Sequence, residues 1–193
     1  NNSVVLAQVS GQTIMDMMEL TLMSYPGEDG AFPHLSGLTF SVNTSIPSSV
    51  VINEYGEFSG VDGQYRVYDL KVYNSKTEAY EDIDLNATYT LAASNYYLIE
   101  LGSGMKMLES AKILQNEGLL DAEALEKYIT EKLGGTVGEE YAEVKANITF
   151  TDGEITDIPD SGENDKEHKL YTFIRFIIEA VCALFQLVFA LLG

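Results

Sequence analysis

Residues 4–22, VVLAQVSGQTIMDMMELTL, join an apolar run to a helical pattern, with one capping residue between them. The run at 4–9 is typical of a buried strand. Ser10 follows at the position of a helix N-cap. Apolar residues then recur at helical spacing, as Ile14, Met17, Met18 and Leu22. The stretch therefore predicts a buried strand that leads directly into an amphipathic helix.

The segments downstream add strands and helices without a strict alternation. Runs of alternating or β-branched residues predict strands at 38–42, 65–73, 89–94 and 144–150, with a hairpin inside 46–64. Pro26-Gly27 ends the first helix, and helical spacing predicts further helices over 105–115 and from Asp121 to Gly134-Gly135. This order predicts an α+β fold, with mixed sheets and helices packed outside them, rather than a doubly wound sheet.

Composition limits the classes of function. The chain has 193 residues, of which 11 are basic and 30 acidic, so its formal net charge is −19. A nucleic-acid partner is not expected, because binding a phosphate backbone requires a surface of Lys and Arg. The single cysteine excludes an intramolecular disulfide framework. A hydrophobic content of 46% is high enough to build a core.

The composition changes near residue 151 and divides the chain into three parts. Residues 1–150 have a globular pattern, residues 151–169 (TDGEITDIPDSGENDKEHK) form an acidic linker, and residues 170–193 are almost entirely apolar. The apolar segment is predicted to be a helix, and it is long enough to cross about 30 Å of hydrocarbon. It fits a membrane anchor, a helix lying in the membrane interface or a helix that docks on the globular part. Because the linker favours a tether, we expect an extracellular or cell-surface protein that contacts a membrane through this segment.

Known catalytic and metal-binding patterns are incomplete in this chain. Residues 82–86 (DIDLN) open like a calcium loop, but Ala87 and Ala93 stand where that loop needs Gly and Glu. The glycines at 102–106 (GSGMK) lack the spacing of a Walker loop. We therefore predict no catalytic residue, no metal ligand and no cofactor within this chain.

Two segments combine an aromatic residue with glycines, which allow close backbone approach. Residues 30–40 read GAFPHLSGLTF and residues 94–105 read SNYYLIELGSGM. Rings from two loops, Phe32 and Tyr97, would be able to enclose a planar group such as a nucleobase. The same pattern also fits aromatic residues that simply belong to the core at strand ends.

In their order and spacing these segments resemble the C-terminal domain of the 5′-nucleotidase family, which includes UDP-sugar hydrolases. The family has a G-x-F segment before an S-G-(L/I) turn, matched by residues 30–32 and 36–38. It also has a strand that leads to a G-G-D-G-(F/Y) loop, matched by residues 101–105 (LGSGM). The resemblance extends over about residues 1–150 and implies the fold of that domain.

The resemblance also implies roles for individual residues. Phe32 and Tyr97 match the two aromatics that stack on the base, and Gly102 and Gly104 match glycines of the closing loop. Ser103 stands where the family has the Asp that holds the ribose hydroxyls. These five residues are the predicted substrate-binding residues, and because Ser103 lacks the two acceptor oxygens of that Asp, we expect weaker binding of the ribose.

In this family a separate N-terminal metallophosphatase domain binds a pair of divalent metal ions and performs the hydrolysis. We therefore expect this chain to partner such a domain, to bind a nucleoside monophosphate or a related phosphoester, and to hydrolyse nothing alone. Two alternatives remain. One is a non-catalytic surface module that has lost nucleotide binding, and the other is a domain of a related hydrolase with another phosphoester substrate.

Overall fold

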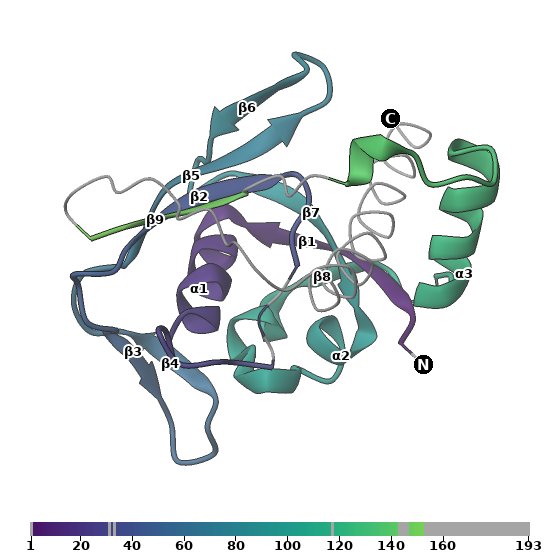
Figure 1. The fold of residues 1–193 in the computed structure, drawn as a ribbon. Helices are drawn as coiled ribbons and strands as arrows, with labels where there is room; N and C mark the ends of the chain where they lie inside the picture. Colours follow the sequence, from purple (N-terminus) through teal and green to yellow (C-terminus); the bar gives the residue numbers. More distant parts are fainter. Residues whose placement is uncertain (1, 31, 33, 117, 143–146, 153–193) are drawn as a thin grey trace.

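The computed structural model describes residues 2–30, 32, 34–116, 118–142 and 147–152. Its strands form three sheets (Figure 1). The strands are β1 Val4–Ser10, β2 Leu38–Asn43, β3 Val50–Ile52, β4 Phe58–Val61, β5 Val67–Asn74, β6 Ala79–Asp82, β7 Thr88–Ser94, β8 Lys112–Gln115 and β9 Ile148–Thr151. The helices are α1 Gly11–Thr21, α2 Asn95–Leu98 and α3 Asp121–Lys127.

The sheets differ in size and in strand direction. One has the order β7-β1-β8 and is antiparallel throughout. The second has the order β6-β5-β2-β9, in which only the β2–β9 pair is parallel. The third is the β3–β4 hairpin. Mixed pairing without repeated βαβ units confirms the predicted α+β class with mixed sheets.

Helix α1 joins the two larger sheets through a shared core. Ser10 caps the helix, because its Oγ accepts the Thr13 N–H at 3.1 Å. The helix lies beneath β2 and β5 (Figure 1) and follows β1 directly in the chain. The core residues come from β1, α1, β2 and β5 and include Val5, Ala7, Val9, Ile14, Met17, Met18, Phe40, Val42, Val67 and Leu70. Burial of these apolar side chains is the main force that holds the elements together.

Most of the predicted elements in the first hundred residues are confirmed, with shifts of a few residues at their ends. The first strand and its capped helix are β1 and α1, and the hairpin within 46–64 is β3–β4. Strand β6 and the short helix α2 were not predicted. In β6 all four residues are exposed, so the strand lacks the alternation of apolar and polar residues that marks a half-buried strand.

The helix predicted over 105–115 is wrong. The chain forms a 3₁₀ turn at Lys106–Ser110 and then strand β8, which pairs with β1. Met105 and Leu108 are 1% exposed, so their helix-like spacing reflects two buried side chains of a short turn. Pairing with the edge of β1 provides hydrogen bonds for the backbone of β8 that a longer helix would have made internally.

Helix α3 has a different cap from the predicted one. Leu120, not Asp121, is the N-cap, and its N–H donates to the Glu123 carboxylate at 3.1 Å. The helix continues as a π turn over Tyr128–Lys132 and ends at Gly134 and Gly135, whose φ angles are +65° and +85°. Those positive values are the left-handed conformation that glycine adopts at helix C-termini.

The C-terminal apolar helix predicted over 170–193 lies outside the described residues, and so does most of the predicted linker at 151–169. In the described ranges no helix has both the length and the apolar character needed to cross a bilayer. The division into 1–150, 151–169 and 170–193 therefore stays a prediction.

Candidate functional site

The first part of the candidate site is the turn that follows β7. Helix α2 begins at Asn95, whose side-chain Oδ1 accepts the Ser3 N–H at 2.8 Å, while its own N–H donates to the Ser3 carbonyl at 2.9 Å. Leu98 is 4% exposed and secures the other end of the helix in the core. Tyr97, between these two anchors, is half-buried against the core. The ring of Tyr97 is therefore carried by a helix that is fixed at both ends.

The second part is the glycine loop after α2. Three residues of this loop have positive φ angles, 52° at Leu101, 56° at Ser103 and 75° at Gly104. A Cβ on Gly102 would lie 2.2 Å from Cζ of Tyr96, so the Tyr96 ring occupies the space of the missing side chain. The two glycines and the left-handed residues allow the loop to close tightly around Tyr96.

The same loop also contacts the β3–β4 hairpin. A Cβ on Gly104 would lie 2.6 Å from the carbonyl oxygen of Gly56, in the turn of that hairpin. The turn is itself fixed by Asn53, whose Oδ1 accepts the N–H groups of Tyr55 at 3.0 Å and Glu57 at 2.9 Å. The hairpin therefore gives the glycine loop a second support besides Tyr96.

The third part is the turn that carries Phe32. The Phe32 N–H donates to the Asp29 carbonyl at 3.1 Å, and the Phe32 side chain is half-buried against the core. Burial raises the pKa of Tyr97, with smaller contributions from Tyr96 and from the negative charge of Asp29. Each of the two predicted segments thus carries an aromatic side chain that packs partly against the core.

Tyr96 is the residue of this site that sequence reasoning missed. Its ring meets that of Tyr97 edge to face, with centroids 5.3 Å apart and planes at 62°. Its Oη accepts the Ser103 N–H at 3.1 Å and lies 3.3 Å from Ser103 Oγ. The adjacent pair of tyrosines in the sequence was a signal, but it could not indicate which ring would pack on Gly102.

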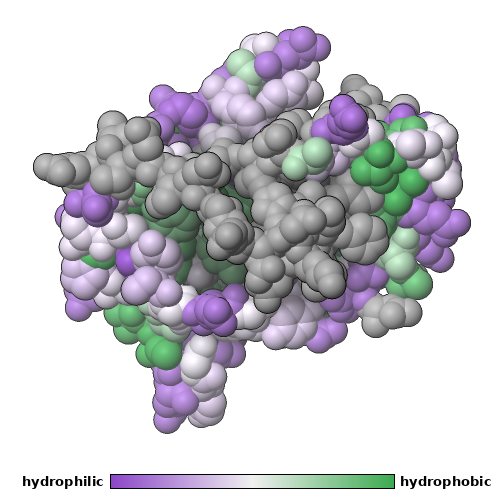
Figure 2. Space-filling view, in the orientation of Figure 1, coloured by the Kyte–Doolittle hydropathy of each residue, from purple (hydrophilic) through white to green (hydrophobic). Residues whose placement is uncertain are grey.

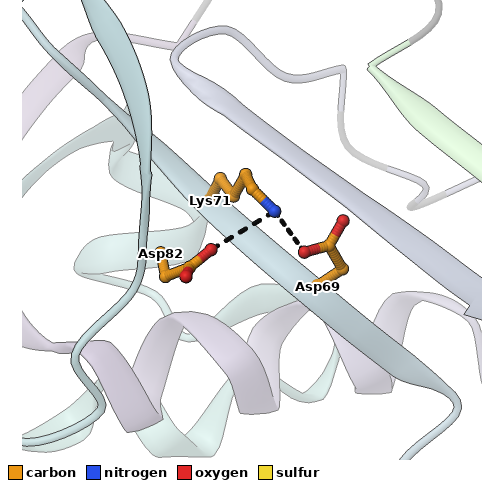
Figure 3. Close-up of polar contacts among 3 residues, drawn as sticks. All are labelled: Asp69, Lys71 and Asp82. Carbon is orange, nitrogen blue, oxygen red and sulfur yellow. Dashed lines mark hydrogen bonds and ion pairs between the residues drawn. The ribbon is translucent and has the colours of Figure 1, made fainter.

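Charged side chains do not form a metal centre among the described residues, where no group of three or more His, Cys, Asp or Glu is arranged to hold an ion. The prominent charged cluster is that of Lys71 with Asp69 and Asp82 on the sheet surface (Figure 3), where the Lys71 Nζ lies 3.2 Å from Asp82 Oδ1. Hydrogen bonds to the two carboxylates, that of Asp69 first, raise the pKa of Lys71. These are solvent-exposed ion pairs that link β5 to β6, and they do not form a site.

A second polar cluster joins α1 to the segment before β5. The Tyr65 Oη donates to Asp16 Oδ1 at 2.7 Å, and the Gln12 Nε2 donates to the same oxygen at 2.8 Å. Burial, followed by the hydrogen bond to Asp16, raises the pKa of Tyr65 from 10.0 to about 12. All three side chains have partners within the cluster, so its role is structural.

This cluster makes a testable prediction about alkaline pH. Because the pKa of Tyr65 is raised in the folded state, its neutral hydroxyl stabilises the fold fully below pH 10, and that contribution is lost as the pH rises through about 12. The free energy of unfolding of the wild type should therefore exceed that of Tyr65→Phe at neutral pH, and the difference should shrink above pH 10. Denaturant unfolding of both proteins at a series of pH values measures this difference in the free energy of unfolding. A difference that stays constant over that range would contradict the assignment.

Most of the described surface in the view of Figure 2 is hydrophilic, in keeping with a net charge of −19. Apolar surface gathers in that view over the β3–β4 hairpin and beside α3. In β3 the side chains of Val51 and Ile52 are 40% and 44% exposed. The net charge of −19 is unfavourable for binding a polyanion.

Together these elements define a domain with several sheets and few helices, in which two aromatic turns and a glycine loop pack against the core. The sequence profile of the 5′-nucleotidase C-terminal domain matches residues 1–110, which is more than half of the chain. The chain therefore belongs to the 5′-nucleotidase C-terminal domain family, as the resemblance implied. The fold continues beyond the matched residues, since β8 pairs with β1 and β9 with β2.

Solved structures share this fold. The 5′-nucleotidase precursor of Thermus thermophilus is 23% identical with a TM-score of 0.60, and the match covers 79% of this chain and 26% of that one. The NAD nucleotidase of Haemophilus influenzae is 20% identical with a TM-score of 0.53 (77% and 24% covered). A putative 5′-nucleotidase of Staphylococcus aureus, solved with α-ketoglutarate, is 14% identical with a TM-score of 0.52 (77% and 27% covered). At these identities the likeness concerns the fold alone, and the chain spans about a quarter of each structure. No curated protein matches the chain.

Proposed function

We propose that this chain is the nucleoside-recognising domain of a 5′-nucleotidase-like phosphoesterase, and that Phe32 and Tyr97 stack on the two faces of the base. The observation that supports the proposal is the partial burial of the two residues in the segments that resemble the family's base-stacking positions. Both side chains are half-buried against the core, so each keeps part of its surface open to a ligand. A half-buried ring presents its π face to a ligand, and because the turn that carries it is already ordered, binding a base would cost little conformational entropy.

Membership of the family supports the same conclusion from a different direction. The three solved structures named above are described as nucleotidases, one of them as putative, and each is about four times longer than the segment this chain matches. Hydrolysis is accordingly assigned to a separate metallophosphatase domain with a pair of divalent metal ions, as the resemblance to the family implies. This chain would contribute affinity and orientation for the nucleoside part of the substrate.

The glycine loop would form the polar side of the proposed site. Gly102 and Gly104 allow its close approach to Tyr96 and to the hairpin, and they leave the exposed Ser103 beside Tyr96. A serine hydroxyl is a weaker acceptor than a carboxylate. We therefore expect stacking on the base to contribute more to the binding free energy than contacts with the sugar.

The test is equilibrium binding of adenosine and AMP to the full chain by calorimetry. Phe32→Ala and Tyr97→Ala should each weaken binding by about 1–3 kcal/mol, because each removes one stacking face. Tyr73→Ala is a matched control, since it removes a tyrosine that is 38% exposed on β5 of the other sheet and should leave affinity unchanged.

The two alternatives give different results in the same experiment. Absence of binding to the wild-type chain would favour a surface module that has lost nucleotide binding. Equal affinities of wild type, Phe32→Ala and Tyr97→Ala would contradict the stacking arrangement. Tighter binding of a UDP-sugar or a cyclic phosphate, lost in both variants, would support a related hydrolase with another phosphoester substrate.

The cellular setting is part of the proposal. An extracellular or cell-surface location, with residues 170–193 tethering the domain to a membrane, follows from the composition of that segment and of the acidic linker before it. Partition of the 170–193 peptide into lipid vesicles would support a tether, and a peptide that stays in the aqueous phase would contradict it.

A further inference from the structure

The side-chain amide of Asn95 joins three segments of the domain. Its Oδ1 accepts the N–H of Ser3, the residue before β1, at 2.8 Å. Its Nδ2 donates to Oε1 of Glu100 at 3.1 Å. Glu100 directly precedes Leu101, where the left-handed turn of the glycine loop begins with a φ of 52°. One side chain thus links the segment before β1, helix α2 and the glycine loop.

The segment before β1 is a fixed reference for this link. The Val4 N–H donates to the Leu119 carbonyl at 2.9 Å, and Val5 is 0% exposed. The Ser3 carbonyl also accepts the backbone N–H of Asn95 at 2.9 Å. Both the backbone and the side chain of Asn95 are therefore tied to a residue whose own position is set by the first strand of the core.

Helix α2 depends on such anchors, because it has only four residues. A helix of this length is not stable by itself. Leu98, which is 4% exposed, fixes one end in the core, and Asn95 fixes the other. The Glu100 N–H donates to the Asn95 carbonyl at 3.1 Å, and Tyr97 lies between the two residues in the chain. A shift of Asn95 would therefore move the Tyr97 ring and the start of the glycine loop together.

We propose that Asn95 is a positioning residue of the base-binding site, and that its amide sets the orientation of Tyr97 and of the glycine loop relative to the core. The inference rests on the nucleoside recognition proposed above. Stacking has a specific geometry, and a small misplacement of a binding group reduces affinity. Asn95 does not need to touch the ligand for this role. A residue that only stabilises the fold would instead leave the affinity for a nucleoside unchanged.

The first variant is Asn95→Asp. It keeps an acceptor for the Ser3 N–H but replaces the donor that faces Glu100 by a carboxylate oxygen. Water can replace the lost hydrogen bond at this exposed contact, but it does not remove the repulsion between the two carboxylates. At low ionic strength, where this repulsion is screened least, adenosine should bind about three- to tenfold more weakly. Adenosine is uncharged, so the new carboxylate does not repel the ligand itself.

Glu100→Gln tests whether this repulsion is the cause. In the double variant Asn95→Asp, Glu100→Gln, the glutamine amide can donate to the new carboxylate, so the link is restored with donor and acceptor exchanged. Its affinity for adenosine should return to within about twofold of that of the wild type. Glu100→Gln alone keeps an acceptor for the Asn95 amide and should bind like the wild type. Calorimetry well below the unfolding midpoint of each variant measures these affinities.

Asn74 offers a matched control on the other sheet. Its Oδ1 accepts the Lys76 N–H at 2.9 Å, and its Nδ2 donates to Glu81 Oε2 at 3.0 Å. Asn74→Asp therefore introduces the same repulsion between β5 and β6. It should leave the affinity for adenosine unchanged.

The outcomes separate the two proposals. Weaker binding by Asn95→Asp that Glu100→Gln restores would support the positioning role. Equal affinities of the wild type and Asn95→Asp, a loss that Glu100→Gln does not restore, or an equal loss in Asn74→Asp would overturn it and leave nucleoside recognition standing. No binding of adenosine to the wild type would overturn the proposed function and this inference with it.

Discussion

Glu19→Ala is expected to destabilise the fold by about 2–6 kcal/mol, because each buried donor that loses its acceptor costs about 1–3 kcal/mol. Glu19 is 0% exposed, and its carboxylate accepts the Arg66 N–H at 3.0 and 2.9 Å and the Val67 N–H at 2.9 Å. Removal of the side chain leaves two buried donors without an acceptor.

The surroundings of Arg66 explain why the loss should affect a wide region. Its guanidinium donates to the carbonyls of Leu22 at 3.1 Å and Tyr25 at 3.3 Å, and it lies 5.5 Å from the centroid of the Tyr25 ring. Tyr25 in turn stacks on Phe150 of β9, with centroids 4.9 Å apart. Glu19 therefore connects the end of α1 to the start of β5 and, through Tyr25, to β9.

Denaturant unfolding followed by circular dichroism would measure this effect. Glu19→Gln keeps one acceptor oxygen and should cost less than Glu19→Ala. Glu54→Ala makes the same truncation at an exposed position and should change stability by less than about 0.5 kcal/mol. If Glu19→Ala and Glu54→Ala were equally stable, the buried carboxylate would have no structural role.

Gly11→Ala is expected to destabilise the fold by about 1–3 kcal/mol or more. Gly11 is the first residue of α1, and a Cβ there would lie 2.2 Å from the carbonyl oxygen of Asp84 and 2.9 Å from Cα of Leu85. Both are backbone atoms, so no side chain can rotate away. The Gly11 N–H donates to the Ala87 carbonyl at 3.0 Å, which holds the two segments at this close distance.

The control is Gly30→Ala, since a Cβ on Gly30 would meet no atom within 4 Å. We expect that variant to unfold within about 0.5 kcal/mol of the wild type. Thermal or denaturant unfolding of the two alanine variants side by side measures the difference. Equal stabilities would show that the segment at 84–87 moves aside at no cost, contrary to the contacts described.

The fold class followed from the sequence because the decisive pattern is local. A strand, a capping serine and a helical stripe at 4–22 can be identified from side-chain periodicity alone, and they form β1 and α1. The prediction for 105–115 was wrong because two buried residues, Met105 and Leu108, are three positions apart, which is also the spacing of apolar residues on one face of a helix. Its strand depends on pairing with β1, about a hundred residues earlier, which periodicity does not record.

The candidate site was accessible to sequence reasoning only in part. Phe32, Tyr97, Ser103 and the two loop glycines stand out as aromatic and glycine positions. The role of Tyr96 depends on the space over Gly102, which only three-dimensional packing shows. The same holds for Glu19, since a helical glutamate normally faces solvent, and its burial reflects two backbone donors at the start of β5.

The central claim is that Phe32 and Tyr97 enclose a nucleobase. Proton NMR of adenosine titrated with the full chain tests this most directly, because aromatic rings stacked on a base shift its protons upfield. The account predicts upfield shifts of the base protons with the wild type and their loss with the double variant Phe32→Ala, Tyr97→Ala. Base protons that do not shift with the wild type, or that shift equally with the double variant, would contradict it.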